Sequence, residues 1–224
     1  MNKLRGTGPP GLSSGSSFVQ SLGVVDYGVG NMRSVANALN RVGADWEVAR
    51  HPGELTRFQR LLLPGVGAFG SAMASLAGNG LTDSIMDAAD AGVPILGICL
   101  GMQLLSEQSD ESPGVLGLGL IAAQTKTITP GMATNTGFRR VRLSSGGGDA
   151  IPLTREKDFY FNHSFHVVPA MPDLISATFQ WNQQEVVAAV SSRNIFGVQF
   201  HPEKSQGQGL AVLRKFANDG VLQL

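Results

Sequence analysis

The chain contains a single cysteine, Cys99, whose sequence surroundings are those of a nucleophile. The apolar residues 93–96 lead into Gly97-Ile98-Cys99-Leu100-Gly101 and then into a helix predicted over residues 102–106. A strand that turns sharply into a helix through glycines lifts the side chain between them off the end of a sheet. The first amides of that helix would favour the thiolate form of Cys99. A lone cysteine is often a small buried hydrophobe, but such a residue needs no glycine on each side, so we interpret Cys99 as a nucleophile.

A candidate base follows the last predicted strand. The apolar residues 195–200 run directly into His201-Pro202-Glu203-Lys204. A carboxylate two residues after a histidine can fix the tautomer of the imidazole while the ring takes a proton from a thiol. Taken alone, His-Pro-Glu is typical of a surface loop. Together with the glycine-flanked cysteine, it predicts a triad of Cys99, His201 and Glu203.

A glycine-rich loop could complete such a site. Pro64-Gly65-Val66-Gly67 follows a buried strand predicted over residues 60–63. Sites in open parallel sheets form beyond the carboxyl ends of the strands, so this loop is expected beside Cys99. Its backbone N–H groups then predict an oxyanion hole, and the alternative is an ordinary turn. Residues 28–30 also read Gly-X-Gly, but Arg33 stands where a dinucleotide fingerprint needs its third glycine, so that loop is not assigned a nucleotide.

Composition limits the class of protein. A chain of 224 residues can bury one full core, and we expect residues 18–224 to form one domain behind a Gly-, Ser- and Pro-rich tail at 1–17. Lys plus Arg and Asp plus Glu both number 17, which argues against nucleic acid or an anionic membrane as a partner. One cysteine allows no internal disulfide, and neither a bilayer-spanning run nor a secretory signal is visible. We therefore expect a cytoplasmic location.

Strand and helix patterns must position these residues, and they alternate in the first half of the chain. Strands are predicted at 22–26, 46–49 and 60–63 and before Cys99, with helices at 32–42 and 81–91. The second half is richer in strands, predicted at 121–128, 139–143, 158–168, 174–178, 186–190 and 195–200, with a hairpin tip at 144–148 and a final helix at 209–218. These patterns predict an α/β fold: a flavodoxin-like open sheet with a parallel core, helices on both faces and an additional antiparallel β layer.

The motifs resemble those of a known enzyme family. Residues 64–67, 97–103 and 197–205 are similar to the three signatures of class I (triad-type) glutamine amidotransferases, and the resemblance extends over about residues 22–218. Within that class, residues 26–31, 64–69 and 159–165 resemble the glutaminase subunits of imidazole glycerol phosphate synthases. The resemblance implies that glutamine is hydrolysed through a Cys99 thioester, with His201 as base and Glu203 orienting it.

The resemblance also implies a substrate site and a partner, and it implies neither metal nor cofactor. The tetrahedral oxyanion would be held by amides of Val66 or Gly67 and of Leu100. L-glutamine would be bound by Gly65, Gln103, Glu111 and the backbone around His163, Ser164 and Phe165. Ammonia would pass through a channel to a separate (β/α)8-barrel synthase subunit of a heterodimer, in histidine biosynthesis. Gly65 and Gly67 make a peptide flip inexpensive, so we expect the partner to gate the oxyanion loop.

One stretch departs from the pattern and leaves alternatives open. Where the histidine-pathway subunits usually carry Pro-His-Met-Gly-Trp-Asn, this chain has Asn-Thr-Gly-Phe-Arg-Arg at 135–140. The same glutaminase could instead supply ammonia to an amidotransferase that acts on a nucleotide-linked sugar in surface-polysaccharide synthesis. A non-catalytic binding subunit would have lost the triad, and a stand-alone thiol hydrolase would be fully active without a partner.

Overall fold

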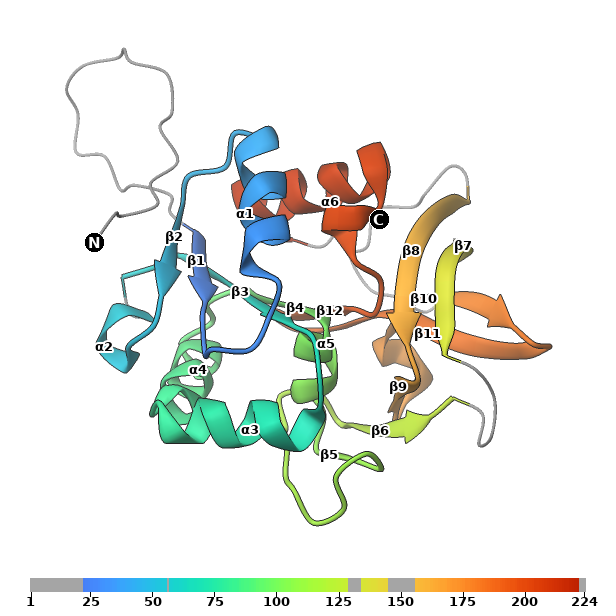
Figure 1. Cartoon of the computed structure of the whole chain (residues 1–224), viewed down its shortest axis with the longest axis horizontal. Helices are drawn as coiled ribbons and strands as arrows, with labels where there is room; N and C mark the ends of the chain where they lie inside the picture. The colour runs from blue at the N-terminus through green and yellow to red at the C-terminus, as the bar shows by residue number, and fades with distance from the viewer. Residues whose placement is uncertain (1–21, 56, 129–133, 145–155, 222–224) are drawn as a thin grey trace.

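The computed structural model describes residues 22–55, 57–128, 134–144 and 156–221 (Figure 1). The predicted tail at 1–17 and positions 145–148 of the predicted hairpin tip lie outside the described residues. The described part contains no helix that is long and apolar enough to cross a membrane.

Five parallel strands form one half of a nine-stranded sheet and carry the candidate site at their carboxyl ends. In spatial order they are β2 (Trp46–Ala49), β1 (Leu22–Val25), β3 (Arg60–Gly65), β4 (Ile95–Cys99) and β12 (Ile195–Val198). Strands β1, β3 and β4 are buried along their whole length, as expected for strands covered on both faces. The register pairs Gly65 with Cys99 across β3 and β4, and Val198 with Ile98 across β12 and β4.

The antiparallel half continues the same sheet. Beyond β12 the order runs β11 (Gln184–Ser192), β10 (Ile175–Trp181), β7 (Asn135–Leu143) and β8 (Lys157–His163). Within the described residues, β5 (Gln108–Ser109), β6 (Ala123–Thr127) and β9 (Phe165–Pro169) form a separate three-stranded sheet. The mixed α/β architecture is as predicted, but most of the expected antiparallel layer is an extension of the main sheet, because β11 pairs with β12 edge to edge.

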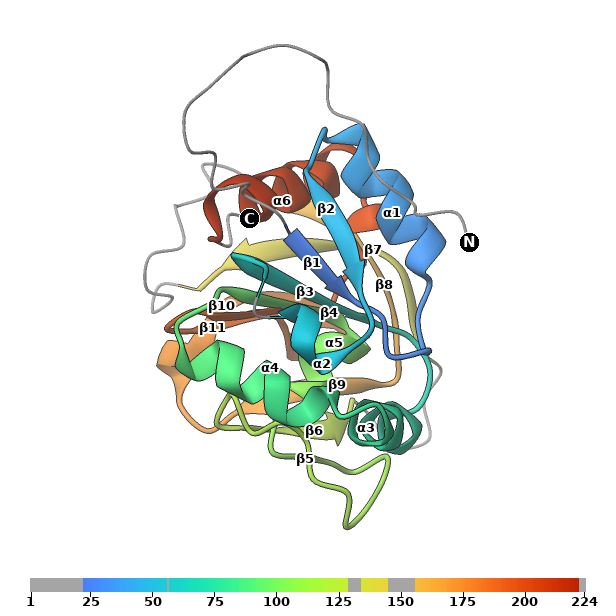
Figure 2. The ribbon, with the colours of Figure 1, turned by 90° about the vertical axis from the view of Figure 1, so that its left-hand side faces the viewer.

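Helices cover both faces of the sheet (Figures 1 and 2). On one face lie α1 (Met32–Arg41) and α6 (Gln206–Asp219), and on the other lie α2 (Pro52–Leu55), α3 (Phe69–Gly78) and α4 (Leu81–Asp90). Short α5 (Leu100–Leu104) follows Cys99, and the 3-10 turns η1 (Pro172–Leu174) and η2 (Pro202–Lys204) complete the elements. Each face has its own apolar core. Helix α1 shows why: it buries Val35, Ala38 and Leu39, which share one side of a helix.

Candidate active site

Cys99 ends β4 in a strained turn. Its φ of 54° and ψ of −108° lie in a region that non-glycine residues rarely adopt, and α5 begins at the next residue, two residues earlier than predicted. A Cβ atom on Gly101 would lie 1.8 Å from the carbonyl oxygen of Leu63, and one on Gly97 would lie 2.6 Å from the carbonyl oxygen of Gly101. Both glycines therefore allow strand β4, its turn and strand β3 to pack closely around the cysteine.

His201 lies three residues beyond β12, the strand next to β4. Its Nδ1 atom is 2.9 Å from Oε1 of Glu203, and both side chains are almost fully buried. Because a carboxylate accepts, Nδ1 carries the donated proton, and Nε2 is left for Cys99. Burial alone would lower the pKa of His201, but hydrogen bonds to Cys99 and Glu203, together with their charges, raise it to about 9.

The glycine-rich loop after β3 lies beside Cys99. Val66 and Gly67 line the same cavity as the cysteine, and so does Leu100, the residue after it. Gly67 has φ of 103°, a conformation that favours glycine. Gly65 does not line the cavity, and a Cβ atom there would lie 2.6 Å from the hydroxyl of Tyr27. The structure thus brings three of the four candidate residues of this part of the site to the cavity wall.

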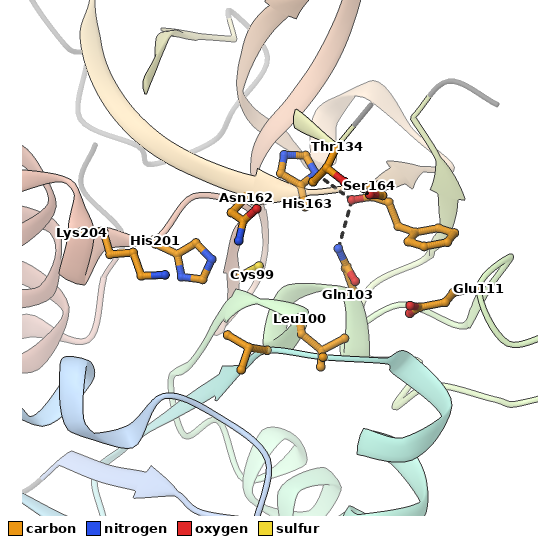
Figure 3. Close-up of a pocket in the computed structure, with 13 residues that line it drawn as sticks. Cys99, Leu100, Gln103, Glu111, Thr134, Asn162, His163, Ser164, His201 and Lys204 are labelled. Carbon is orange, nitrogen blue, oxygen red and sulfur yellow. Dashed lines mark hydrogen bonds between the residues drawn. The ribbon is translucent and has the colours of Figure 1, made fainter. Parts of the chain in front are cut away.

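A cavity of about 240 Å³ opens over the sulfur of Cys99 (Figure 3). The predicted substrate residues line it as well: Gln103, Glu111, His163, Ser164 and Phe165. The remaining lining residues, Thr134, Asn162 and Lys204, were not singled out from the sequence, although the last two stand next to predicted positions. His201 and Lys204 lie on one side of Cys99 in Figure 3, and Gln103 and Glu111 lie on the other.

Glu111 joins the cavity to the glycine-rich loop. Its Oε2 atom accepts a hydrogen bond of 2.8 Å from the backbone N–H of Phe69, the first residue of α3. A carboxylate at this position satisfies one of the free amides of the helix and is favoured by the helix dipole. Glu111 therefore contacts the start of α3 and also lines the cavity.

Buried amides connect Cys99 with the far wall of the cavity. Gln199, which is fully buried, points its Nε2 atom at the sulfur of Cys99 at 3.7 Å. Gln103 donates to Oε1 of Gln199 at 3.2 Å and to the carbonyl oxygen of Phe165 at 3.0 Å. These contacts cross from α5 to the stretch between β8 and β9, which the sequence predicted as one strand and the structure divides at Ser164.

The chain has clear relatives. A family model described as glutamine amidotransferase class-I matches residues 23–219. Curated proteins named imidazole glycerol phosphate synthase subunit HisH match along most of their length. The protein from Moorella thermoacetica is 41% identical over 88% of this chain and 94% of its own length. Those from Pyrococcus furiosus and Methanothermobacter thermautotrophicus are 40% and 42% identical, over 87% of this chain and 97% and 96% of theirs.

Solved structures share the fold. One described as a glutamine amidotransferase has a TM-score of 0.68 at 18% identity and covers 88% of this chain and 97% of its own. A chain of the PurLQS structure from Thermotoga maritima has a TM-score of 0.69 at 21% identity and covers 88% of this chain and 95% of its own. The fold is therefore shared by chains that differ widely in sequence.

Proposed function

The chain belongs to the class-I glutamine amidotransferase family, and from that premise we propose that Cys99, His201 and Glu203 carry out its glutaminase reaction. The chain is the glutaminase subunit of an imidazole glycerol phosphate synthase, a function supported by curated relatives about 40% identical over most of their length. The observation that carries the catalytic proposal is the buried pair of His201 and Glu203, which leaves Nε2 facing the sulfur at the floor of the cavity.

The reaction follows from this geometry. His201, whose pKa of about 9 keeps it protonated at neutral pH, already holds the proton of the thiol, and the sulfur of Cys99 attacks the side-chain amide carbon of glutamine. The carbon–nitrogen bond breaks, His201 returns the proton to the departing ammonia, and a γ-glutamyl thioester remains. Water, activated by His201, then cleaves the thioester to glutamate and free thiol. Glu203 stabilises the imidazolium that forms twice in this cycle.

The cavity walls supply the other groups. We assign the oxyanion to the amides of Leu100 and of Val66 or Gly67, each donor being worth roughly 3 kcal/mol in the transition state. Glu111, already fixed by its bond to α3, faces the amino group of glutamine. Gln103 and the backbone of residues 163–165 bind the rest of the amino-acid group. Domain limits of 18–224 and a cytoplasmic location complete the proposal.

Ammonia has to leave the cavity for a partner, which we propose is a (β/α)8-barrel synthase subunit in a heterodimer. An aromatic ridge beside the base is the docking surface we assign to it. Phe138 is 45% exposed and packs its edge on Tyr160 at 5.6 Å, and the ammonium of Lys204 lies 5.6 Å from the centre of the same ring. The backbone of Tyr160 accepts from the amide of His201, so the ridge is directly tied to the active site.

Glutamate release from glutamine tests this function. We expect slow release by the chain alone and strong stimulation by the barrel subunit with its nucleotide substrate, abolished by Cys99→Ala. Equal rates with and without the liganded barrel would contradict partner gating. Absence of stimulation, with Cys99 still alkylated by a glutamine-analogue label, would favour the nucleotide-sugar partner that the unusual stretch 135–140 also allows.

A further inference from the structure

His163 has a fully determined hydrogen-bond arrangement. Its Nδ1 atom is 2.8 Å from the carbonyl oxygen of Phe165, which can only accept, so Nδ1 carries a proton. Burial is the main cause that lowers the pKa of His163 to about 3, and the ring is therefore neutral. Its Nε2 atom is then a bare acceptor, 3.0 Å from Nδ2 of Asn135, which can only donate. Asn135 therefore selects the tautomer that holds the carbonyl of Phe165.

Arg139 fixes the amide of Asn135. Its Nε atom donates to Oδ1 of Asn135 at 3.0 Å, which orients Nδ2 toward the histidine. The two other guanidinium nitrogens donate to the carbonyl oxygens of Phe138 and Thr136, at 2.8 and 3.0 Å. The guanidinium also lies over the ring of Trp181, 4.5 Å from its centre. The arginine is thus held by its own strand β7 and by strand β10.

Gly137 makes this arrangement possible. Asn135, Gly137 and Arg139 alternate along β7 and share one face of the strand. The glycine has φ of 118°, and a Cβ atom there would lie 3.4 Å from Nη1 of Arg139. The arginine side chain therefore folds back across the glycine to reach the asparagine.

We propose that Arg139 and Asn135 are positioning residues for glutamine, an inference that rests on the proposed glutaminase function. They act through His163, which fixes the carbonyl of Phe165 and with it the Phe165–His166 peptide, whose first residue lines the cavity. This carbonyl has a second donor, Gln103, whose other contact leads to Gln199 and the sulfur of Cys99. Loss of the outer contacts frees one side of the carbonyl and leaves the catalytic pair untouched.

Arg139→Met tests the proposal, because methionine keeps an unbranched chain beside Trp181 and removes every donor. We expect the KM for glutamine to rise about tenfold, which corresponds to the free energy of about one hydrogen bond. We expect kcat to stay within about twofold of the wild-type value. The control is Arg142→Gln, an exposed arginine of the same strand that pairs with Glu156. An unchanged KM in Arg139→Met, or an equal change in both variants, overturns the proposal.

Asn135→Asp makes the KM for glutamine depend on the protonation state of His163, which a purely structural role of Asn135 would not do. A carboxylate only accepts, so Nε2 of His163 must then carry a proton. The imidazolium still donates from Nδ1 to the carbonyl, whereas the neutral ring moves its one proton to Nε2 and loses that bond. We therefore expect KM to be near the wild-type value while His163 is protonated and about tenfold higher once it is neutral.

The protonation state of His163 is read from the ¹⁵N shifts of its ring at each pH of the assay. The proposal is overturned if the ratio of KM between the variant and the wild type does not change with the protonation state of His163. This test holds at whatever pH His163 titrates in the variant. Failure of the glutaminase function itself is distinguishable, because the wild-type complex would then release no glutamate, while the tautomer of His163 would remain measurable.

Discussion

His201 is buried against Glu203 and Cys99, and this makes the ionisation of His201 part of the stability of the fold. The pKa of His201 is about 9 in the folded chain and 6.5 as an ordinary value. A raised pKa means that the folded state binds the proton more tightly than the unfolded state. The stabilisation is complete below about pH 6.5 and is lost as pH rises to about 9. We expect the unfolding free energy from urea titrations to fall across that interval.

The control is His201→Asn, which cannot take up the proton. The unfolding free energy of this variant should fall less between pH 6.5 and pH 9 than that of the wild type. The difference between the two curves belongs to His201, because the two proteins share every other titrating group. Parallel curves for the two proteins would contradict the assignment of a raised pKa to this histidine.

Glu203→Gln isolates the charge of the triad carboxylate. The amide retains the size of the side chain but cannot stabilise the imidazolium, and its NH2 group can reverse the tautomer. We expect kcat for glutamine hydrolysis in the complex to fall roughly 100-fold with KM little changed. Initial rates with and without the substitution measure this, and a kcat within about threefold of wild type would exclude the orienting role.

At this scale, the residues that we propose for the chemistry carry a signal in the sequence, whereas the contacts of their supporting residues do not. Cys99, His201 and the cavity residues stand in short motifs whose spacing reflects local geometry. Gln199 and Asn135 stand in stretches that the sequence analysis singled out, but their contacts could not be predicted, because their partners lie far along the chain and are brought near only by the fold. Gly65 was expected at the substrate; it pairs with Cys99 across β3 and β4 and does not line the cavity.

At the scale of elements, the turn from β4 into α5 depends on backbones that nearly touch. Gly101→Ala would place a methyl group 1.8 Å from a backbone oxygen of β3, which no side-chain rotation can relieve. We expect a loss of at least about 3 kcal/mol in unfolding free energy, or failure to fold. The matched control is Gly78→Ala in α3, where nothing lies within 4 Å. Alanine there should stabilise by up to about 1 kcal/mol, and equal effects would contradict the steric account.

Sequence patterns located most elements and missed those without a periodic signal. The predicted helix over 32–42 and the strand over 46–49 agree with α1 and β2 to within one residue. Helix α3 was not predicted, since Phe69–Gly78 is rich in Gly, Ala and Ser and follows the glycine-rich loop directly. Strand β7 begins at Asn135, four residues before its predicted start. The prediction missed this part because the first residues of the strand are mostly polar and include Gly137, so they lack an alternating apolar pattern.

At the scale of the whole molecule, the aromatic ridge is the surface where we expect a substitution to weaken binding of the barrel subunit. Phe138→Asp places a charge on an exposed aromatic surface beside the active site, so we expect the dissociation constant for the barrel subunit to rise at least tenfold, as for a central interface residue. Calorimetry or fluorescence titration measures this. The control is Met86→Asp, since Met86 is 40% exposed on α4 and far from the ridge. Equal loss in both variants would place the barrel elsewhere.

The α/β class, the parallel core and the helices on both faces were predicted from the sequence and are confirmed by the structure. The continuity of the main sheet was not predicted. Strand order cannot be inferred from local periodicity, because it depends on which edges meet after folding. Here β12 closes the gap between β4 and β11, and this one insertion joins the parallel and antiparallel halves.

The same insertion has a consequence for the newly made protein. On the ribosome, β4 and its cysteine emerge long before β12, and His201 follows β12. In the mechanism that we propose, the thiol has no base until that strand takes its place beside β4, so the nascent chain should be unable to hydrolyse glutamine. With that mechanism, the order of strands in the sheet would prevent ammonia release by a chain whose last central strand has not yet folded.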